Sequence, residues 1–247
     1  MISVCMATYN GERFLQEQID SILCQLNPED ELIISDDGST DGTLEIIASY
    51  QDSRIKLLHH KKKPEYEKIK YSRNFYYATD NFENALTAAQ GDYIFLADQD
   101  DVWMENKVDE CLKALSTWDC VVHNMEIVDI TNNPLSLTRY TTNPVPSSWF
   151  GILWKMRLWG CCLCFRKSVL SEILPFPQKL IAHDYWICAI VLKKINLGYV
   201  SLPLIRYREH QDSTSYMVQN PLHYKIQYRI ILFFQILFHK SSLTRFP

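Results

Sequence analysis

The sequence predicts an α/β fold in which helices cover both faces of a mainly parallel sheet. Short apolar runs typical of buried strands alternate with segments whose apolar residues recur at helical spacing, and this alternation continues through the first half of the chain. Polar and acidic residues follow directly on three of the strand-like runs. Alternating strands and helices favour a parallel sheet, and ligands bind such sheets at the carboxyl ends of the strands.

The first four predicted elements are strand, helix, strand and helix. Residues 2–7 and 31–35 are apolar runs typical of strands, and residues 14–26 have one apolar helical face. The turn 36–41 leads into the second helix and ends in Ser-Thr-Asp, three residue types common at helix N-termini. The apolar positions of the two helices are Leu15, Ile19, Ile22, Leu23 and Leu26, then Leu44, Ile47 and Ala48.

The next elements are a strand at 54–59, a helix around 82–89 and a buried strand at 93–97. Residues 61–77 form a basic, aromatic segment, which we interpret as a solvated loop with aromatic rings packed beneath it rather than as a cover for a substrate. Residues 132–148 contain three prolines and are predicted to be a loop that begins the second half of the domain.

Composition narrows the function classes. The 247 residues are enough for one well-buried domain, and a hydrophobic fraction of 47% excludes a disordered chain. A net charge of −4 gives no basic field for a nucleic acid partner. The eight cysteines lie mostly in apolar runs without a second pair at zinc-site spacing, which favours free thiols. We expect no signal peptide and no membrane span, and therefore a cytoplasmic protein.

The most informative motif is the acidic group Asp98-Gln99-Asp100-Asp101, directly after the strand-like run 93–97. Three carboxylates crowded at the end of a buried strand repel one another unless a cation or a positively charged ligand neutralises them. A hard divalent ion, held by carboxylate oxygens and substrate phosphates, is the usual solution. The motif therefore predicts chemistry on a phosphorylated donor, and an acidic surface turn is the alternative.

Three motifs together resemble the family-2 glycosyltransferases of the GT-A fold. The order and separations also match those of the family, and the form Asp-Gln-Asp-Asp-Val-Trp is most similar to bacterial rhamnosyltransferase-like members. The resemblance implies one GT-A domain over 1–215, with a nucleotide-sugar half at 1–120 and a smaller acceptor half at 121–215. The apolar and basic composition of the C-terminal stretch predicts an amphipathic helical extension at 216–247. The motifs are Ile2-Ser3-Val4-Cys5-Met6-Ala7-Thr8-Tyr9-Asn10, Ile34-Ser35-Asp36-Asp37-Gly38-Ser39-Thr40-Asp41 and Gly91-Asp92-Tyr93-Ile94-Phe95-Leu96-Ala97-Asp98-Gln99-Asp100-Asp101-Val102-Trp103.

The resemblance implies a nucleotide site at the strand ends. Asp37, with Asp36 beside it, would meet a pyrimidine base, whose ring N–H a carboxylate can accept, and Tyr9 would stack on that base. Asp98 would approach the ribose. A helix-capping turn is the alternative for the two neighbouring aspartates. The residues assigned to nucleotide binding are Thr8, Tyr9, Asn10, Asp36, Asp37 and Asp98.

The resemblance also implies a divalent metal ion, manganese or magnesium. Asp100, helped by Asp101, would hold the ion, which would neutralise charge on the departing nucleoside diphosphate. Residues 202–213 are similar to the closing segment of the family, in which an Arg and a His follow a short strand. This similarity would put His210 near the diphosphate or its metal, and Arg208 or Arg206 near phosphate oxygens.

The segment Ala182-His183-Asp184-Tyr185-Trp186 resembles the later acidic motif of the family, whose Asp is the catalytic base. A carboxylate within hydrogen-bond reach can take the proton of an acceptor hydroxyl as the C–O bond forms, and an in-line attack inverts the anomeric centre. His183 stands where Glu is usual, so the assignment rests on Asp184. The alternative is that Asp184 caps the predicted helix 185–194.

The interpretation that follows is an inverting glycosyltransferase that moves a sugar from a UDP- or dTDP-sugar to a hydroxyl of a saccharide or lipid-linked acceptor, in bacterial surface polysaccharide biosynthesis. A haloacid-dehalogenase-like phosphatase is one alternative, because residues 96–102 also match a strand followed by Asp-x-Asp-x-Val with a nucleophilic Asp98. A catalytically silent nucleotide-sugar-binding protein is another. The apolar and basic segment 224–240 would contact the inner face of the plasma membrane, form a homodimer contact or pack on the core.

Overall fold

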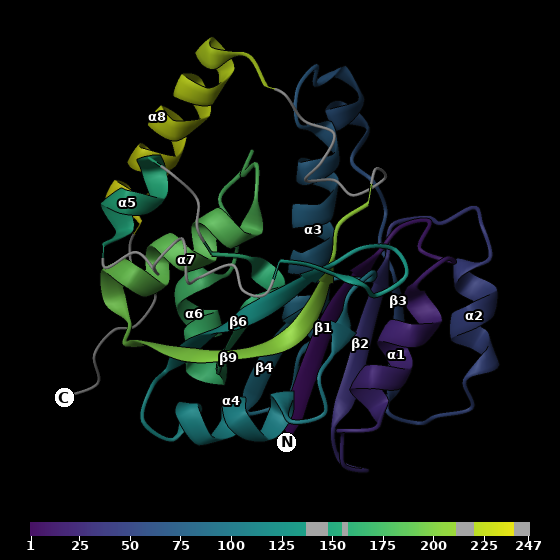
Figure 1. The fold of residues 1–247 in the computed structure, drawn as a ribbon. Coiled ribbons are helices and arrows are strands. Elements are labelled where there is room, and N and C mark those ends of the chain that lie inside the picture. Colours follow the sequence, from purple (N-terminus) through teal and green to yellow (C-terminus); the bar gives the residue numbers. More distant parts are fainter. Residues whose placement is uncertain (137–147, 155–157, 211–219, 240–247) are drawn as a thin grey trace.

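A single curled sheet organises the molecule (Figure 1). The computed structural model describes residues 1–136, 148–154, 158–210 and 220–239, within which nine strands join in the order β3-β2-β1-β4-β8-β6-β9-β5, with β7 beside β6. The strands are β1 Ile2–Thr8, β2 Glu31–Asp36, β3 Ile55–His59, β4 Tyr93–Ala97, β5 Val102–Trp103, β6 Cys120–Val128, β7 Pro134–Ser136, β8 Leu163–Arg166 and β9 Leu197–Arg208. The helices are α1 Leu15–Leu23, α2 Thr43–Ser49, α3 Arg73–Ala88, α4 Lys107–Leu115, α5 Trp149–Trp154, α6 Leu170–Ile173, α7 His183–Lys194 and α8 Leu222–Phe238, with 3-10 helices at Pro64–Lys68, Gly160–Cys162 and Lys167–Val169.

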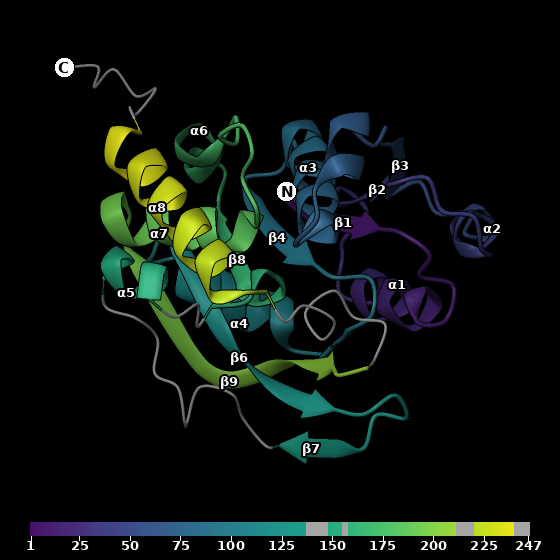
Figure 2. The same cartoon turned by 90° about the horizontal axis from the view of Figure 1, so that it is seen from above.

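The first half of the sheet is parallel. β3, β2, β1 and β4 pair in parallel, and β1, β2 and β4 are almost wholly buried. Figure 2 shows α3 and α1 on opposite sides of β1, which explains why these strands are apolar throughout rather than alternating. The predicted α/β class is confirmed.

The second half of the sheet mixes strand directions. β8 pairs antiparallel with β4 and β6, whereas β9 pairs in parallel with β6 and antiparallel with β5. The long strand β9 curls across the front of the molecule in Figure 1. Its curl returns residues 208–210 to the acidic group between β4 and β5.

Two segments predicted as loops contain regular structure. Residues 61–77 include the 3-10 helix Pro64–Lys68 and the beginning of α3. The rings of Tyr66 and Tyr76 are buried, with their centroids 5.2 Å apart, which confirms the expectation of packed aromatics. The loop predicted at 132–148 is wrong at its start, because Pro134–Ser136 is an edge strand, where a proline is tolerated. The rest of that segment, 137–147, lies outside the described residues.

Two further expectations concern thiols and membrane spans. The eight cysteines are free, and all but Cys24 are buried. Among the described residues, no helix combines the length and apolar character needed to cross a bilayer.

Candidate active site

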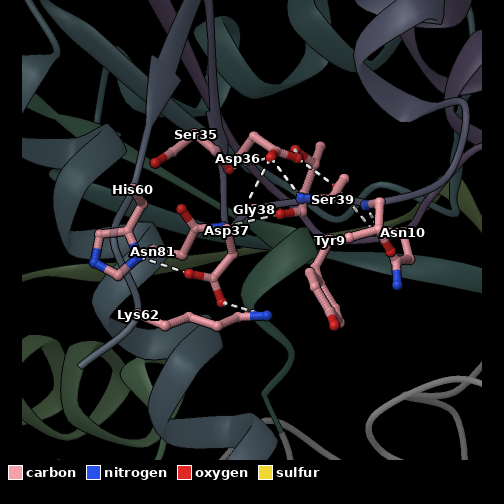
Figure 3. A network of polar contacts seen from close by, with 12 residues as sticks. Tyr9, Asn10, Ser35, Asp36, Asp37, Gly38, Ser39, His60, Lys62 and Asn81 are labelled. Carbon is pink, nitrogen blue, oxygen red and sulfur yellow. Dashed lines mark hydrogen bonds and ion pairs between the residues drawn. The ribbon is translucent and has the colours of Figure 1, made fainter. Parts of the chain in front are cut away.

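The loop after β2 is anchored by Asp36 (Figure 3). One carboxylate oxygen of Asp36 accepts hydrogen bonds from Thr8 Oγ1 at 3.0 Å and Ser39 Oγ at 2.6 Å, and the other accepts the backbone N–H groups of Gly38 and Ser39 at 3.0 and 2.9 Å. Gly38 takes a positive φ of 77°, which a residue with a Cβ rarely adopts. Both oxygens of Asp36 therefore serve the turn, and the carboxylate is not directed at an open site.

Asn10 and Asp41 hold the same loops together. Asn10 Oδ1 accepts the N–H of Thr40 at 2.9 Å, and Asp41 Oδ1 accepts the N–H of Thr43 at 3.1 Å, at the beginning of α2. The structure thus shows Thr8 and Asn10, two residues predicted to bind nucleotide, within the framework of the loops. The helix α2 has Gly42 as its N-cap residue and no side-chain cap, so the helix-capping turn that the sequence left open for Asp36 and Asp37 is not what Asp36 forms; it closes the turn before the helix.

Asp37 belongs to a different group, together with Tyr9 and Lys62 (Figure 3). Asp37 Oδ1 lies 2.7 Å from Nδ1 of His60, and Oδ2 lies 3.7 Å from Nζ of Lys62. The same Nζ lies 3.2 Å from the ring centroid of Tyr9, whose side chain is 47% exposed. The amide of Gln99 holds the Tyr9 backbone, accepting its N–H at 2.9 Å and donating to its carbonyl at 3.1 Å. This sheet edge therefore presents an aromatic ring, a carboxylate and an ammonium group side by side.

The acidic group after β4 divides into a buried part and a rim. Asp101 is fully buried, and its Oδ2 has no hydrogen-bond partner among the described residues. Asp98, Asp101 and Cys161 offer ligand atoms that all lie within 4.8 Å of one another. Burial, and then repulsion from Asp100 and Asp184, raises the pKa of Asp98 to about 7. Burial, and then repulsion from Asp100 and Asp98, raises the pKa of Asp101 well above its usual range. This crowding is the condition that a bound cation relieves.

A buried lysine faces this cluster. Lys107 is fully buried, donates from Nζ to the carbonyl oxygen of Cys161 at 3.0 Å and lies 4.0 Å from the ring centroid of Trp103. The sequence interpretation missed Lys107, Gln99, His60 and Lys62. Of these, only Lys62 could have been found from the sequence. It belongs to the basic segment that follows β3, and in a parallel sheet the end of β3 lies next to the end of β2, where Asp37 stands.

Asp100 meets His210 at the rim. His210 Nε2 lies 2.8 Å from Asp100 Oδ2, and both side chains keep some exposure, 8% and 20%. The other ring nitrogen, Nδ1, has no hydrogen-bond partner in the described part of the chain. A carboxylate oxygen and an imidazole nitrogen this close can bind one divalent ion, with the remaining ligands supplied by water and phosphate. The residues present therefore fit the metal that the sequence predicts.

Arg208 does not face the open site. Its side chain is 1% exposed, Nη1 donates to the carbonyl oxygen of Asp100 at 2.9 Å, and Nη2 donates to Glu17 Oε2 at 2.7 Å and Asn132 Oδ1 at 2.8 Å. The guanidinium carbon lies 4.4 Å from the ring centroid of Phe14. Because protein groups enclose the guanidinium, this geometry gives no support to the predicted phosphate contact. Arg208 instead ties the end of β9 to the acidic group.

Asp184 lies in the first turn of α7 and interacts with the Asp98 carboxylate. Burial raises the pKa of Asp184 to about 6, although its Oδ1 accepts the N–H of Tyr185 at 2.8 Å. Burial also lowers the pKa of His183 to about 3, and its ring packs 4.0 Å from that of Phe82. The helix begins at His183, so Asp184 is not its N-cap residue. It is a partly buried carboxylate whose raised pKa makes it a stronger base than an ordinary aspartate.

Comparison with known proteins places these features in a family. A family model described as Glycosyl transferase family 2 matches residues 3–174. The dTDP-rhamnosyl transferase RfbG of Shigella flexneri is 25% identical, covering 97% of this chain and 82% of its own length. The Escherichia coli UDP-Glc:alpha-D-GlcNAc-diphosphoundecaprenol beta-1,3-glucosyltransferase WfgD is 27% identical, covering 87% and 79%. The S. aureus TarS 1–349 structure in complex with UDP-GlcNAc has a TM-score of 0.69 at 16% identity, covering 98% of this chain and 67% of that one. Since the family model spans most of its length, the chain belongs to glycosyl transferase family 2 and has the GT-A fold.

Proposed function

We propose that the protein is an inverting glycosyltransferase that moves a sugar from a UDP- or dTDP-sugar to a hydroxyl of a saccharide or lipid-linked acceptor in bacterial surface polysaccharide biosynthesis. The observation that carries this proposal is the gathering of the Tyr9–Asp37 group, the Asp100–His210 pair and Asp184 around one sheet edge. The printed names of two relatives support the donor and acceptor classes, dTDP-rhamnosyl for RfbG, and UDP-Glc with a diphosphoundecaprenol acceptor for WfgD. A nucleotide-sugar donor also favours the cytoplasm as the place of the reaction.

The donor base is assigned to Tyr9 and Asp37. The exposed ring of Tyr9 can stack on a pyrimidine, and Asp37 Oδ2 can accept its ring N–H because His60 engages only Oδ1. Asp36 contributes by holding the turn, since its own oxygens are engaged. Lys62 lies against both base contacts, so a base that enters from this side must displace it.

A manganese or magnesium ion is assigned to Asp100 and His210, with Asp98 nearer the ribose and Asp101 behind them. When bound, such an ion supplies positive charge that stabilises the departing nucleoside diphosphate. The chain prepares the site by crowding carboxylates whose pKa values are raised in its absence. Arg208 is assigned the task of positioning the Asp100 backbone.

Asp184 is assigned as the general base. It removes the proton from the acceptor hydroxyl while that oxygen forms a bond to the anomeric carbon and the bond from that carbon to the diphosphate oxygen breaks. Attack from the side opposite the leaving group inverts the configuration. With a pKa of about 6, the carboxylate is mostly ionised at neutral pH and keeps enough basicity to take part in this transfer.

Calorimetry with UDP and dTDP, with and without manganese, tests the donor site. We expect binding that requires the metal and weakens at least about tenfold in Asp100→Ala, because the ion loses a charged ligand. The matched control, Asp109→Ala, removes an exposed carboxylate on α4 and should bind like the wild type. Folded protein that binds neither nucleotide would overturn the proposal.

Release of nucleoside diphosphate from a panel of UDP- and dTDP-sugars separates an enzyme from a silent binder. We expect turnover that Asp184→Asn lowers by about 10²–10⁴ while donor binding is kept. Donor binding without any turnover across the panel would favour the silent binder. The phosphatase alternative predicts a covalent intermediate on Asp98. Membership of the glycosyltransferase family argues against this alternative.

A further inference from the structure

We propose that the outer face of α8 binds the surface of an anionic lipid bilayer. The inner face of this helix packs on the molecule through Leu232 and Ile236, which are 4% and 0% exposed. The opposite face carries large apolar side chains that are 41–71% exposed, and most of them recur at four-residue spacing along one stripe. They are Leu222, Ile226, Ile230, Ile231, Phe234, Leu237 and Phe238.

The stripe continues onto α5. Phe150 is 60% exposed and lies edge-on to Phe233 of α8, with ring centroids 6.1 Å apart. Figures 1 and 2 both show α5 and α8 together on the outside of the molecule, beyond α7. We call these exposed residues of α8, together with Phe150, the α8–α5 patch. A contiguous apolar surface of this kind usually marks a site of contact with a protein or a membrane.

The charge of this region selects an anionic lipid surface. Within the described residues 220–239 the sequence contains Lys225 and Arg229 but no Asp or Glu, although the whole chain has a net charge of −4. A helix that combines an apolar face with basic residues binds in the interface of a membrane, and anionic headgroups attract it. Two copies of the chain joined through this face would bring like charges together, which disfavours a dimer.

The patch lies beside the acceptor side of the candidate active site. The ring of Tyr228 on α8 lies 6.2 Å from that of Tyr185, the neighbour of Asp184. One turn earlier on α8, the Tyr224 hydroxyl donates to the carbonyl oxygen of Tyr71, just before α3, at 3.1 Å. Resting on the proposed function, this arrangement lets a lipid-linked acceptor reach Asp184 from the membrane surface.

Flotation of the full chain with vesicles tests the proposal. We expect the protein to float with vesicles of phosphatidylcholine and phosphatidylglycerol, and not with phosphatidylcholine alone. The double variant Ile230→Glu, Phe234→Glu should lower the membrane partition coefficient at least about tenfold, because it removes two inserting side chains and adds negative charge. The control Leu202→Glu, at a 46% exposed position on β9, should float like the wild type. Melting temperature and nucleotide binding should be unchanged in both.

Three results would overturn the proposal: wild-type protein that stays with neither kind of vesicle, a double variant that floats as well as the wild type, or a dimer that the double variant splits without any effect on vesicles. The last result would assign the patch to a second copy. The assay contains no donor and no acceptor, so its failure leaves transfer to a water-soluble acceptor untouched. Loss of transfer with normal flotation would instead count against the proposed function alone.

Discussion

Asp36 and Asp37 are neighbours in the sequence with opposite surroundings in the fold. Side chains of an extended chain point alternately to its two sides, so Asp36 turns into its own loop while Asp37 turns toward His60 and Lys62. The sequence identifies the pair but cannot say which carboxylate is used up by the turn. That information lies in the hydrogen bond from Thr8, 28 residues away, and in the way the turn brings Gly38 and Ser39 back onto the Asp36 carboxylate.

Lys62 is expected to compete with the donor base. Replacing Lys62 by Ala removes an ammonium group that lies against Tyr9 and near Asp37, and a cation–π contact of about 0.5–1 kcal/mol should become roughly a two- to fivefold gain in uridine affinity. Calorimetry with uridine measures this without phosphate, whose attraction to lysine would obscure the effect. The control is Lys61→Ala, an exposed neighbour of equal charge. Weaker binding would show that the ammonium group pairs with the base.

The pKa of Asp184 predicts the acid limb of activity. Burial raises that pKa to about 6, and a general base works only when ionised. The transfer rate at saturating substrates should therefore be level above pH 6 and fall about tenfold per pH unit below it. Asp184→Asn should lose about 10²–10⁴ in rate and show no such limb. A wild-type rate that stays level well below pH 6 would assign the proton transfer to another group.

At the scale of elements, Arg208 is expected to act as a strut between β9, α1 and the acidic group. Arg208→Lys keeps the charge but cannot make the same three hydrogen bonds, and it should lower the free energy of unfolding by about 2 kcal/mol. Urea unfolding measures this loss. Arg206→Lys, at a 47% exposed side chain paired with Glu126, is the control and should change little. Weaker nucleotide binding at unchanged stability would instead point to a phosphate contact.

Glu31 is expected to make the parallel half of the sheet sensitive to acid. Its carboxylate accepts hydrogen bonds from Lys56 Nζ at 2.6 Å, Gln90 N–H at 2.8 Å and the Ser3 hydroxyl, which joins β1, β2, β3 and the approach to β4. Burial raises the pKa of Glu31, but these hydrogen bonds outweigh it and leave the pKa below the ordinary glutamate value. The stabilisation is therefore present above pH about 4.3 and lost as the pH falls through the lower folded-state pKa.

Glu31→Gln should accordingly lower the free energy of unfolding by about 1–3 kcal/mol at neutral pH. The difference from the wild type should shrink as both are acidified below that window. Glu29→Gln, an exposed neighbour, serves as the control and should track the wild type at every pH. A difference that stays constant into acid would show that the charge of Glu31 contributes nothing.

The strands and helices of the first half follow from sequence pattern, but their partners in the second half do not. β8 and β6 are mostly buried strands, and their residue patterns would suit a parallel or an antiparallel neighbour equally well. The short edge strand β7 begins with Pro134, a residue that ordinarily signals a loop. The curl of β9 depends on register shifts against β6 that no periodicity records.

At the scale of the whole molecule, the candidate site exists because β9 returns to the acidic group. His210 and Asp100 are 110 residues apart in sequence and 2.8 Å apart in space. Family resemblance predicts a metal role for Asp100 and places His210 near the diphosphate or its metal, whereas a lone histidine beside two arginines carries no spacing signal of its own. The same return buries Arg208, which resemblance alone had put near phosphate.

Binding of metal and nucleotide should therefore stabilise the two halves of the molecule together. With manganese and UDP at about a hundred times the dissociation constant, we expect about 2.7 kcal/mol of stabilisation and a rise in melting temperature of roughly 5–10 °C. Because a ligand bound only by the folded state acts through mass action, chelating the metal should remove most of this rise. His210→Gln should remove it as well, whereas the exposed His223→Gln on α8 should keep it. If His210→Gln still showed the full rise in melting temperature, His210 would not be a metal ligand, and Asp100 would hold the ion with other ligands.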